Sequence, residues 1–335
     1  METKELLGTP DALSPDTGTD APKGADPTEQ YQRSAERYRK KSKAEGTLER
    51  YREHWSAFAA WCAAHGGLCA LPVEPKTLAM YLAARADEGI RPSTLGVSLS
   101  AIADMHRRHK LQVPNSDPLV EETWEGIRRQ LGRARKKKAP LCAAELRRMI
   151  DALPAGLIGQ RDRALLLLGF AGGFRRAELV ALHCSSLRFV PEGLEVFIER
   201  SKTDQEQQGH LKMIAYGSDP ATCPVRSVKD WLDLSSLTAG PVFRPINRYE
   251  RLGAKALTAH AVATIVKRTA AAAGLPVPEL SGHSLRSGFV TQAYEGGADI
   301  SSIMDQTGHT EVATAFEYVR RKDKWKKPAS AKLGL

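Results

Sequence analysis

The sequence has little cysteine and few aromatic residues, and it contains no long apolar run. Its five cysteines are odd in number and scattered, which argues against a disulfide scaffold and indicates reduced thiols. Cys62, His65 and Cys69 lie close together, but no second pair completes a zinc site with the usual spacing. No stretch approaches the roughly 20 apolar residues of a membrane span, and the first 30 residues have no apolar core. We therefore expect a soluble, cytoplasmic protein without a signal peptide or a metal.

The charge of the chain is unevenly distributed. Lysine and arginine number 49 against 39 acidic residues, which gives a net charge of +10. Residues 1–30 carry seven acids and two bases, a net charge of −5, so the remaining residues carry +15. A body this basic predicts a polyanionic partner, with nucleic acid the leading candidate. The alternative is a basic enzyme that has no nucleic-acid partner.

Composition and periodicity divide the chain into five segments. Residues 1–44 begin with an acidic, turn-rich stretch and are expected to form a disordered tail. Residues 45–133 carry apolar residues at helical spacing in four stretches, which predicts a compact helical domain. Residues 134–142 continue a run of basic residues and are expected to be a linker. Residues 143–327 are expected to form a second domain, and residues 328–335 a short C-terminal tail.

The second domain is predicted to be mostly helical with one small antiparallel sheet. The stretches "LEVFIER" and "HLKMIAY" alternate as strands do, and the polar "SKTDQEQQG" between them is typical of a hairpin loop. Helices are expected after Leu141, in "RDRALLLLGFAGGF" and "RRAELVAL", and near 224–237, 257–273, 283–296, 299–307 and 311–321. The predicted fold class is therefore mainly α with a small antiparallel β-sheet.

Several polar residues of this second domain occupy positions that a role in the hydrophobic core does not explain. Arg175 follows two glycines at the start of a helix, where the backbone favours anions, and its planar guanidinium suits a phosphate. His283 and Arg286 lie three residues apart, so both can contact one ligand. Tyr318 points about 110° away from the apolar stripe of its predicted helix.

Lys202 at the end of a strand and His309 in a second Gly-His pair complete the set. Each of these residues has an ordinary structural explanation when it is taken alone. Together they suit phosphoryl transfer without a metal, in which cations neutralise the non-bridging oxygens and a tyrosine hydroxyl attacks phosphorus. The sequence lacks the glycine-rich loop of a nucleotide-binding enzyme, so we expect no cofactor.

Five short motifs occur along the chain in a fixed order: "GGFRRAEL", a lysine in the hairpin, "HSLR", "GH", and a tyrosine nine residues after that second Gly-His. In these motifs and their order the chain resembles the tyrosine recombinase (phage integrase) family. The stretches "TLERYREHWSAFAAWC" and "RPSTLGVSLSAIADMHRRH" resemble the helical core-binding domain of that family. The resemblance covers residues 45–321. It implies an N-terminal helical core-binding domain and a C-terminal mixed α/β catalytic domain of the recombinase type.

The resemblance also implies a role for each residue of the set. Tyr318 would attack the scissile phosphate, forming a 3′-phosphotyrosyl link and freeing a 5′-hydroxyl. Arg175 and Arg286 would bind the non-bridging oxygens. Lys202 would protonate the leaving 5′-oxygen as the general acid, and His283 would assist proton transfer.

Two further residues take supporting roles by the same resemblance. His309 would hydrogen-bond the phosphate or orient the tyrosine, and Glu178 would brace the site from behind Arg175. The chain departs from the usual family pattern at Thr307, where leucine is common, and at Phe174 and Ala177. We expect none of these departures to contact a reacting group.

The resemblance implies double-stranded DNA with inverted-repeat sites as the partner, a homotetramer on two paired sites, accessory proteins, and association with the nucleoid. The biological role remains open between phage integration, transposition or other movement of mobile elements, and chromosome resolution. A type IB topoisomerase and a DNA-binding protein that has lost catalysis are the alternative functions. The expected DNA contacts, apart from the catalytic residues, are His106, Arg107, Arg108, Arg128, Arg129, Arg133, Arg135, Lys136, Lys137 and Lys138.

Overall fold

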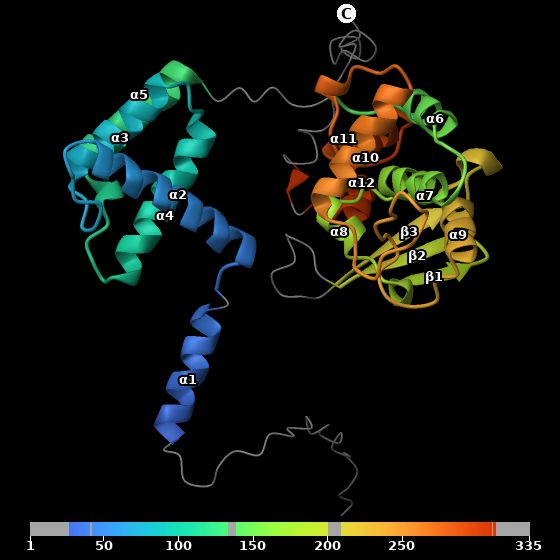
Figure 1. Ribbon diagram of the computed structural model, residues 1–335, viewed down its shortest axis with the longest axis horizontal. Coiled ribbons are helices and arrows are strands. Elements are labelled where there is room, and N and C mark those ends of the chain that lie inside the picture. Colours follow the sequence, from blue (N-terminus) through green and yellow to red (C-terminus); the bar gives the residue numbers. More distant parts are fainter. Residues whose placement is uncertain (1–26, 41, 133–138, 200–208, 310, 313–335) are drawn as a thin grey trace, which may run out of the picture. The chain divides into compact units, whose positions relative to one another are not determined.

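The computed structural model describes residues 27–40, 42–132, 139–199, 209–309 and 311–312. Contacts within the chain divide it into two compact units, with the division between Arg135 and Lys136. The first unit is entirely helical in its described residues, and the second combines helices with one sheet (Figure 1). None of the described helices is long and apolar enough to cross a membrane.

The described residues of the first unit form five α-helices. They are α1 (Pro27–Lys40), α2 (Glu45–Ala64), α3 (Pro75–Asp87), α4 (Pro92–Arg108) and α5 (Pro118–Leu131), with a short 3₁₀ turn at Pro114–Ser116. Proline occupies the first helical position of α3, α4 and α5, where its missing N–H costs no hydrogen bond. The helix α2 packs on α4, and α3 packs on α5. Their facing side chains form one core, which includes Phe58, Leu78, Leu82, Leu95 and Ile102.

Helix α1 differs from the expectation for the N-terminal segment. The predicted disordered tail covered residues 1–44, and the structure has a helix at Pro27–Lys40 within it. The described side chains of this helix are almost all exposed, so it rests on local interactions: the first turn contains Glu29, whose carboxylate pairs with Arg33 one turn later. The low apolar content of this segment predicts few packing contacts. It does not exclude a helix that is supported by ion pairs between residues one turn apart.

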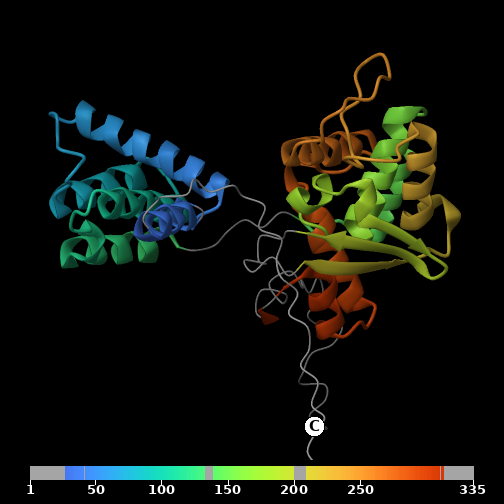
Figure 2. The same ribbon diagram turned by 90° about the horizontal axis from the view of Figure 1, so that it is seen from below.

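The second unit contains a three-stranded antiparallel sheet in its described residues. The strands are β1 (Leu187–Val190), β2 (Gly193–Ile198) and β3 (His210–Ala215), in the spatial order β1-β2-β3. Val190 is opposite Gly193 in the first pair, and Ile198 is opposite His210 in the second. Figure 2 shows the strands as one thin layer beside the helices. The predicted fold class is confirmed, although β1 was not predicted because four residues are too few to establish an alternating pattern.

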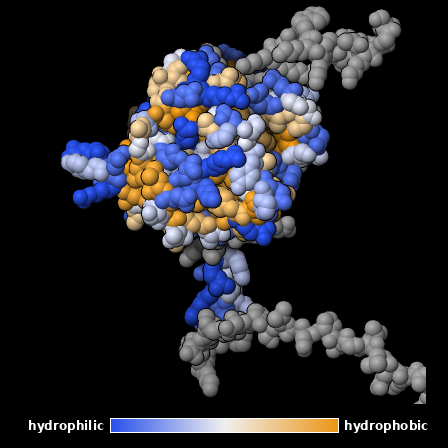
Figure 3. All heavy atoms as spheres, turned by 90° about the vertical axis from the view of Figure 1, so that its right-hand side faces the viewer, coloured by the Kyte–Doolittle hydropathy of each residue, from blue (hydrophilic) through white to orange (hydrophobic). Residues whose placement is uncertain are grey.

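Seven α-helices accompany this sheet in the described residues. They are α6 (Ala143–Asp151), α7 (Leu157–Ala171), α8 (Arg176–Val180), α9 (Pro224–Ser235), α10 (Ala259–Ala272), α11 (His283–Glu295) and α12 (Ile300–Thr307), with 3₁₀ turns at Cys184–Ser186, Pro220–Thr222 and Val277–Glu279. The core is apolar and includes Leu165, Leu168, Trp231, Phe243 and Val266. The face of this unit shown in Figure 3 is largely hydrophilic, with apolar residues in scattered groups.

Packing of the helices brings three chain segments together next to β3. The helix α7 contacts α8 and α11, and α11 contacts α12. Hydrogen bonds join the turn between α7 and α8 to α11, to the end of α12 and to β3. The candidate site lies where these segments meet.

Candidate active site

The turn between α7 and α8 sets the position of Arg175. Gly173 has φ +55°, a left-handed conformation that favours glycine, and a Cβ there would lie 2.8 Å from the ring of Phe289. The chain then enters α8, with Arg175 as the residue immediately before the helix. The two glycines noted in the sequence are therefore needed for the tight turn that presents this arginine.

Glu178 holds the backbone and the side chain of Arg175 together. Its carboxylate accepts a hydrogen bond from the Arg175 backbone N–H (2.9 Å) and another from Nη1 (2.6 Å). Burial acts to raise the pKa of Glu178, but these hydrogen bonds and the nearby charges of Arg175 and Lys212 lower it below its usual value. Glu178 is therefore a charged carboxylate at neutral pH and fixes the arginine in place.

Helix α11 carries His283 and Arg286. His283 is its first residue and is exposed, whereas Arg286, one turn later, is 1% exposed. The Arg286 guanidinium donates from Nη1 to the carbonyl of Gly173 at 2.7 Å. Its Nη2 lies 2.7 Å from Nε2 of His309. One buried arginine thus joins α11 to the turn before Arg175 and to the residue that follows α12.

The tautomer of His309 follows from its hydrogen-bond partners. Arginine can only donate, so Nε2 of His309 must accept the hydrogen bond from Arg286 and carries no proton. The ring proton is then on Nδ1, which lies 2.9 Å from Oγ1 of Thr307. The hydroxyl of Thr307 donates to the carbonyl of Ile303 at 2.6 Å, so its oxygen accepts from the imidazole. His309 is neutral in this arrangement.

The electrostatics of the site agree with that assignment. Burial and the positive charges of Arg286, Arg175 and Lys212 lower the pKa of His309 to about 3. Desolvation and the same two arginines, with Arg176, lower the pKa of His283 as well. Both imidazoles are therefore neutral at neutral pH, and Nε2 of His309 is already occupied by the hydrogen bond from Arg286.

The end of α12 places His309 against the arginines. Gly308 has φ +64° and ends the helix in the left-handed conformation. Its carbonyl accepts a hydrogen bond from Nη2 of Arg175 at 3.3 Å. Arg175, Arg286 and His309, which are up to 134 positions apart in the sequence (175 to 309), therefore meet at one place in the fold.

Sequence reasoning missed two residues of this cluster. Lys212 of β3 is 1% exposed, and its ammonium donates to the carbonyls of Gly172 (3.0 Å) and Gln306. The period-2 pattern of "HLKMIAY" could have placed Lys212 on the inner face, because Leu211 and Met213 point outward. Thr307 was noted as a departure from the family pattern and was expected to contact no reacting group. Its hydroxyl contacts the imidazole of His309, a predicted site residue, at 2.9 Å.

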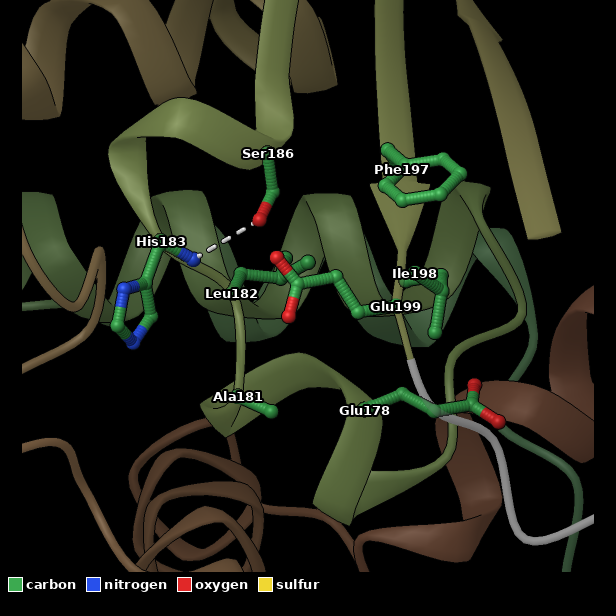
Figure 4. A pocket seen from close by; sticks show the side chains of 8 residues that line it. All are labelled: Glu178, Ala181, Leu182, His183, Ser186, Phe197, Ile198 and Glu199. Atoms are coloured by element: carbon green, nitrogen blue, oxygen red, sulfur yellow. Dashed lines mark hydrogen bonds between the residues drawn. The ribbon is translucent and has the colours of Figure 1, made fainter. Parts of the chain in front are cut away.

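A pocket of about 150 Å³ adjoins this cluster. Figure 4 shows the Glu178 carboxylate at one side of it, below Phe197 and Ile198, while His183 lies on the opposite side. The backbone N–H of His183 donates to Oγ of Ser186 at 3.3 Å. Among the described lining residues, Glu178 is the member shared with the cation cluster. No arginine lines the pocket among the described residues, so it is distinct from the meeting point of the arginines.

Two predicted catalytic residues, Lys202 and Tyr318, lie outside the described residues. The same holds for Arg133, Arg135, Lys136, Lys137 and Lys138 of the predicted DNA contacts. Among the residues that the structure does describe, no group of three or more His, Cys, Asp or Glu side chains is placed to hold a metal ion.

The structure contradicts the expected DNA contact at His106. This residue is fully buried in the first unit. Its Nε2 accepts the backbone N–H of Val73 at 3.0 Å, and Nδ1 lies 2.9 Å from the carbonyl of Ile102. His106 falls on the apolar stripe of α4 and links that helix to the loop before α3.

The other described candidates for DNA contact are on the surface. Arg107, Arg108 and Arg129 are exposed, and Arg128 is half-buried with its guanidinium 5.9 Å from the ring centroid of Trp124. Arg108 donates to Asp104 at 2.7 Å, and Arg129 lies 3.8 Å from Glu125. Their contact with DNA stays a prediction.

Comparison with known proteins identifies the family. The model of the phage integrase family matches residues 140–324. An integrase/recombinase XerD homologue from Selenomonas ruminantium is 37% identical over 294 residues, covering 86% of this chain and 85% of that protein. The chain belongs to the phage integrase family and is a site-specific recombinase of the tyrosine type, as the motifs predicted. The topoisomerase and the silent DNA-binding protein are not favoured.

Two solved structures share the fold at low sequence identity. The Tn1549 transposon integrase in complex with transposon right end DNA has a TM-score of 0.59 and 12% identity, covering 91% of this chain and 99% of that one. The XerH recombinase bound to a palindromic difH substrate has a TM-score of 0.54 and 16% identity, covering 78% of this chain and 73% of that one. These likenesses agree with the arrangement of helices and sheet described above.

The contact between Thr307 and His309 can be tested by stability. Thr307→Val removes the acceptor of the buried Nδ1–H and is expected to lower the free energy of unfolding by about 1–3 kcal/mol. The matched control is Thr269→Val, because Thr269 is equally buried and donates to the carbonyl four residues before it at 2.9 Å, and the partners of its hydroxyl are backbone carbonyls. Urea denaturation of the two variants measures the difference, and equal losses would contradict the role given to Thr307.

Proposed function

We propose that this recombinase cleaves and rejoins double-stranded DNA by attack of Tyr318 on the scissile phosphate, which Arg175 and Arg286 bind. The observation that supports this proposal is the meeting of Arg175, Arg286 and His309 at the end of α12. Three segments far apart in the sequence contribute to one positively charged place. Guanidinium groups there can bind the oxygens of a phosphodiester as charge develops on them.

The neutral histidines give the cluster a means of moving protons. The tyrosine hydroxyl must lose its proton to attack phosphorus, and a neutral imidazole can accept it. His283 is the exposed imidazole at the start of α11, one turn before Arg286, so it can approach a phosphate that Arg286 binds. We assign it the acceptance of that proton, and we assign His309 the orientation of the phosphate or of the tyrosine.

The leaving 5′-oxygen needs a proton in return, and we assign its donation to Lys202. The bond energy of the phosphodiester is retained in the 3′-phosphotyrosyl link, so the rejoining step needs no nucleotide. The arginines supply positive charge to the non-bridging oxygens, and we infer that the reaction proceeds without a metal ion. Glu178 supports the cluster through its two hydrogen bonds to Arg175.

The expected partner is double-stranded DNA with inverted-repeat sites. The XerH structure contains a palindromic substrate and the Tn1549 integrase structure contains a transposon end, and the charge of +10 suits a phosphate backbone. We infer four copies of this chain on two paired sites, with two copies cutting at a time, together with accessory proteins. The recombinase would then be associated with the nucleoid. The surface arginines Arg107, Arg108 and Arg129 are proposed as contacts to the backbone, in which role they carry no sequence information.

A covalent adduct tests the proposed reaction. The protein is incubated, in the presence of EDTA, with a nicked duplex library that has a randomised core, and DNA that stays with the protein on a denaturing gel is amplified and sequenced. Wild type is expected to yield an adduct with an inverted-repeat consensus, and Tyr318→Phe is expected to yield none. Tyr294→Phe, which removes a hydroxyl from α11 of the same unit, is the control and should retain the adduct. An undiminished adduct in Tyr318→Phe would refute the assignment of the nucleophile.

The role of Lys202 can be separated from phosphate binding by changing the leaving group. Lys202→Ala should slow cleavage by about 100-fold or more, the usual contribution of a general acid. A substrate with a 5′-bridging sulfur needs no acid, because a thiol has a pKa of about 8.5 and leaves readily as thiolate. This substrate should restore cleavage by Lys202→Ala, while Arg175→Ala should stay slow on it. A Lys202→Ala enzyme that is equally slow on both substrates would exclude the acid role.

A further inference from the structure

A lysine on the buried face of the sheet is the least expected residue of the second unit. Along β3 the side chains of Leu211 and Met213 point outward, and those of Lys212 and Ile214 point inward. Transfer of an ammonium group into a protein interior is strongly unfavourable unless its charge and its hydrogen bonds are satisfied. An apolar side chain would fill this buried position without the cost of burying a charge. The presence of a lysine therefore needs an explanation beyond packing.

The surroundings of the Lys212 ammonium satisfy it with backbone carbonyls and an aromatic ring. Nζ donates to the carbonyl of Gly172 at 3.0 Å and to the carbonyl of Gln306. It lies 5.0 Å from the centroid of the Phe174 ring, a cation–π distance. Phe174 is one of the family departures noted in the sequence, and here its ring covers the ammonium.

These two carbonyls belong to the two segments that build the phosphate-binding cluster. Gly172 precedes Gly173, whose carbonyl binds Arg286, and Arg175 follows two residues later. Gln306 lies three residues before His309, which the Arg286 guanidinium contacts. Lys212 is thus hydrogen-bonded to both segments at once, and its strand anchors them to the sheet.

We propose that Lys212 is a positioning residue of the recombination reaction: its ammonium holds the segment of Arg175 and the segment of His309 at the separation that the scissile phosphate requires. The inference rests on the proposed function, because it assumes that these two residues bind the phosphate. In this role Lys212 acts through the backbone of both segments.

The electrostatics of the cluster agree with such a role. Burial and the charges of Arg286 and Arg175 act against the ammonium, while Glu178 and Asp305 favour it, and together they lower the pKa of Lys212 to about 7. A bound phosphate would bring negative charge to the same place and favour the charged lysine. The DNA-free site therefore carries buried positive charges, and a bound phosphate would reduce the unfavourable free energy of holding them close together.

Single-turnover cleavage by the full-length protein tests the inference, with the nicked site recovered from the covalent selection as the probe. Lys212→Met keeps the length of the side chain and removes the charge and both hydrogen bonds. Ile214→Ala is the matched control, because Ile214 is buried on the same face of the same strand. Rates are counted per molecule that binds DNA, so an unfolded fraction does not enter the comparison, and melting temperatures are recorded for each variant.

We expect Lys212→Met to bind DNA with unchanged affinity, which depends on many phosphate contacts, and to cleave about 100-fold more slowly, the effect of a misplaced catalytic group. Lys212→Arg, which can donate to both carbonyls, should recover part of the rate, and Ile214→Ala should cleave as wild type does. The 5′-bridging sulfur substrate should not rescue Lys212→Met.

Three results would overturn the inference. Lys212→Met could cleave at the wild-type rate, or Ile214→Ala could be slowed as much at an equal loss of melting temperature, which would reduce Lys212 to a structural residue. Rescue of Lys212→Met by the sulfur substrate would make the lysine a proton donor in place of a positioning residue. Failure of wild type to form any adduct would instead refute the proposed function, so the two failures are distinguishable.

Discussion

The second unit depends on positive charge buried around the end of α12. Three cationic side chains bind consecutive parts of that turn: Lys212 binds the carbonyl of Gln306, Arg175 the carbonyl of Gly308, and Arg286 the imidazole of His309. The carboxylate of Glu178 lies among them and offsets part of their charge. Buried positive charges repel one another strongly in a medium of low polarity. The fold holds them together through backbone carbonyls and leaves a place that an anion would stabilise.

The protonation states of the histidines follow from the same charges. Because Arg286 donates to Nε2 of His309, the imidazole stays neutral and its proton is directed at Thr307. Desolvation lowers the pKa of His283, and the charges of the same arginines lower it further. Burial and positive charge thus act together to keep both imidazoles neutral beside the arginines. Thr307, a departure from the leucine common in the family, is part of this arrangement.

Much of the fold and of the site could be predicted because the relevant signals are local. Glycines before Arg175 and the three-residue spacing of His283 and Arg286 are visible in the sequence, and the hydrophobic periodicity located most helices and two strands. The errors come from assuming that a charged or polar residue lies on the surface. His106 follows Ile102 by four residues and therefore shares the buried face of α4, although it stands beside two arginines. Lys212 was overlooked for the same reason, since its acceptors at 172 and 306 are remote in sequence.

The central claim is that this cluster holds a DNA phosphate for attack by Tyr318, and the position of the covalent bond tests it most directly. The adduct is digested with nuclease and trypsin, and the peptide that carries the remaining nucleotide is identified by mass spectrometry. The account predicts the added mass on the peptide that contains Tyr318, attached to the tyrosine oxygen. Attachment at Tyr216, Tyr294 or any other residue would contradict it.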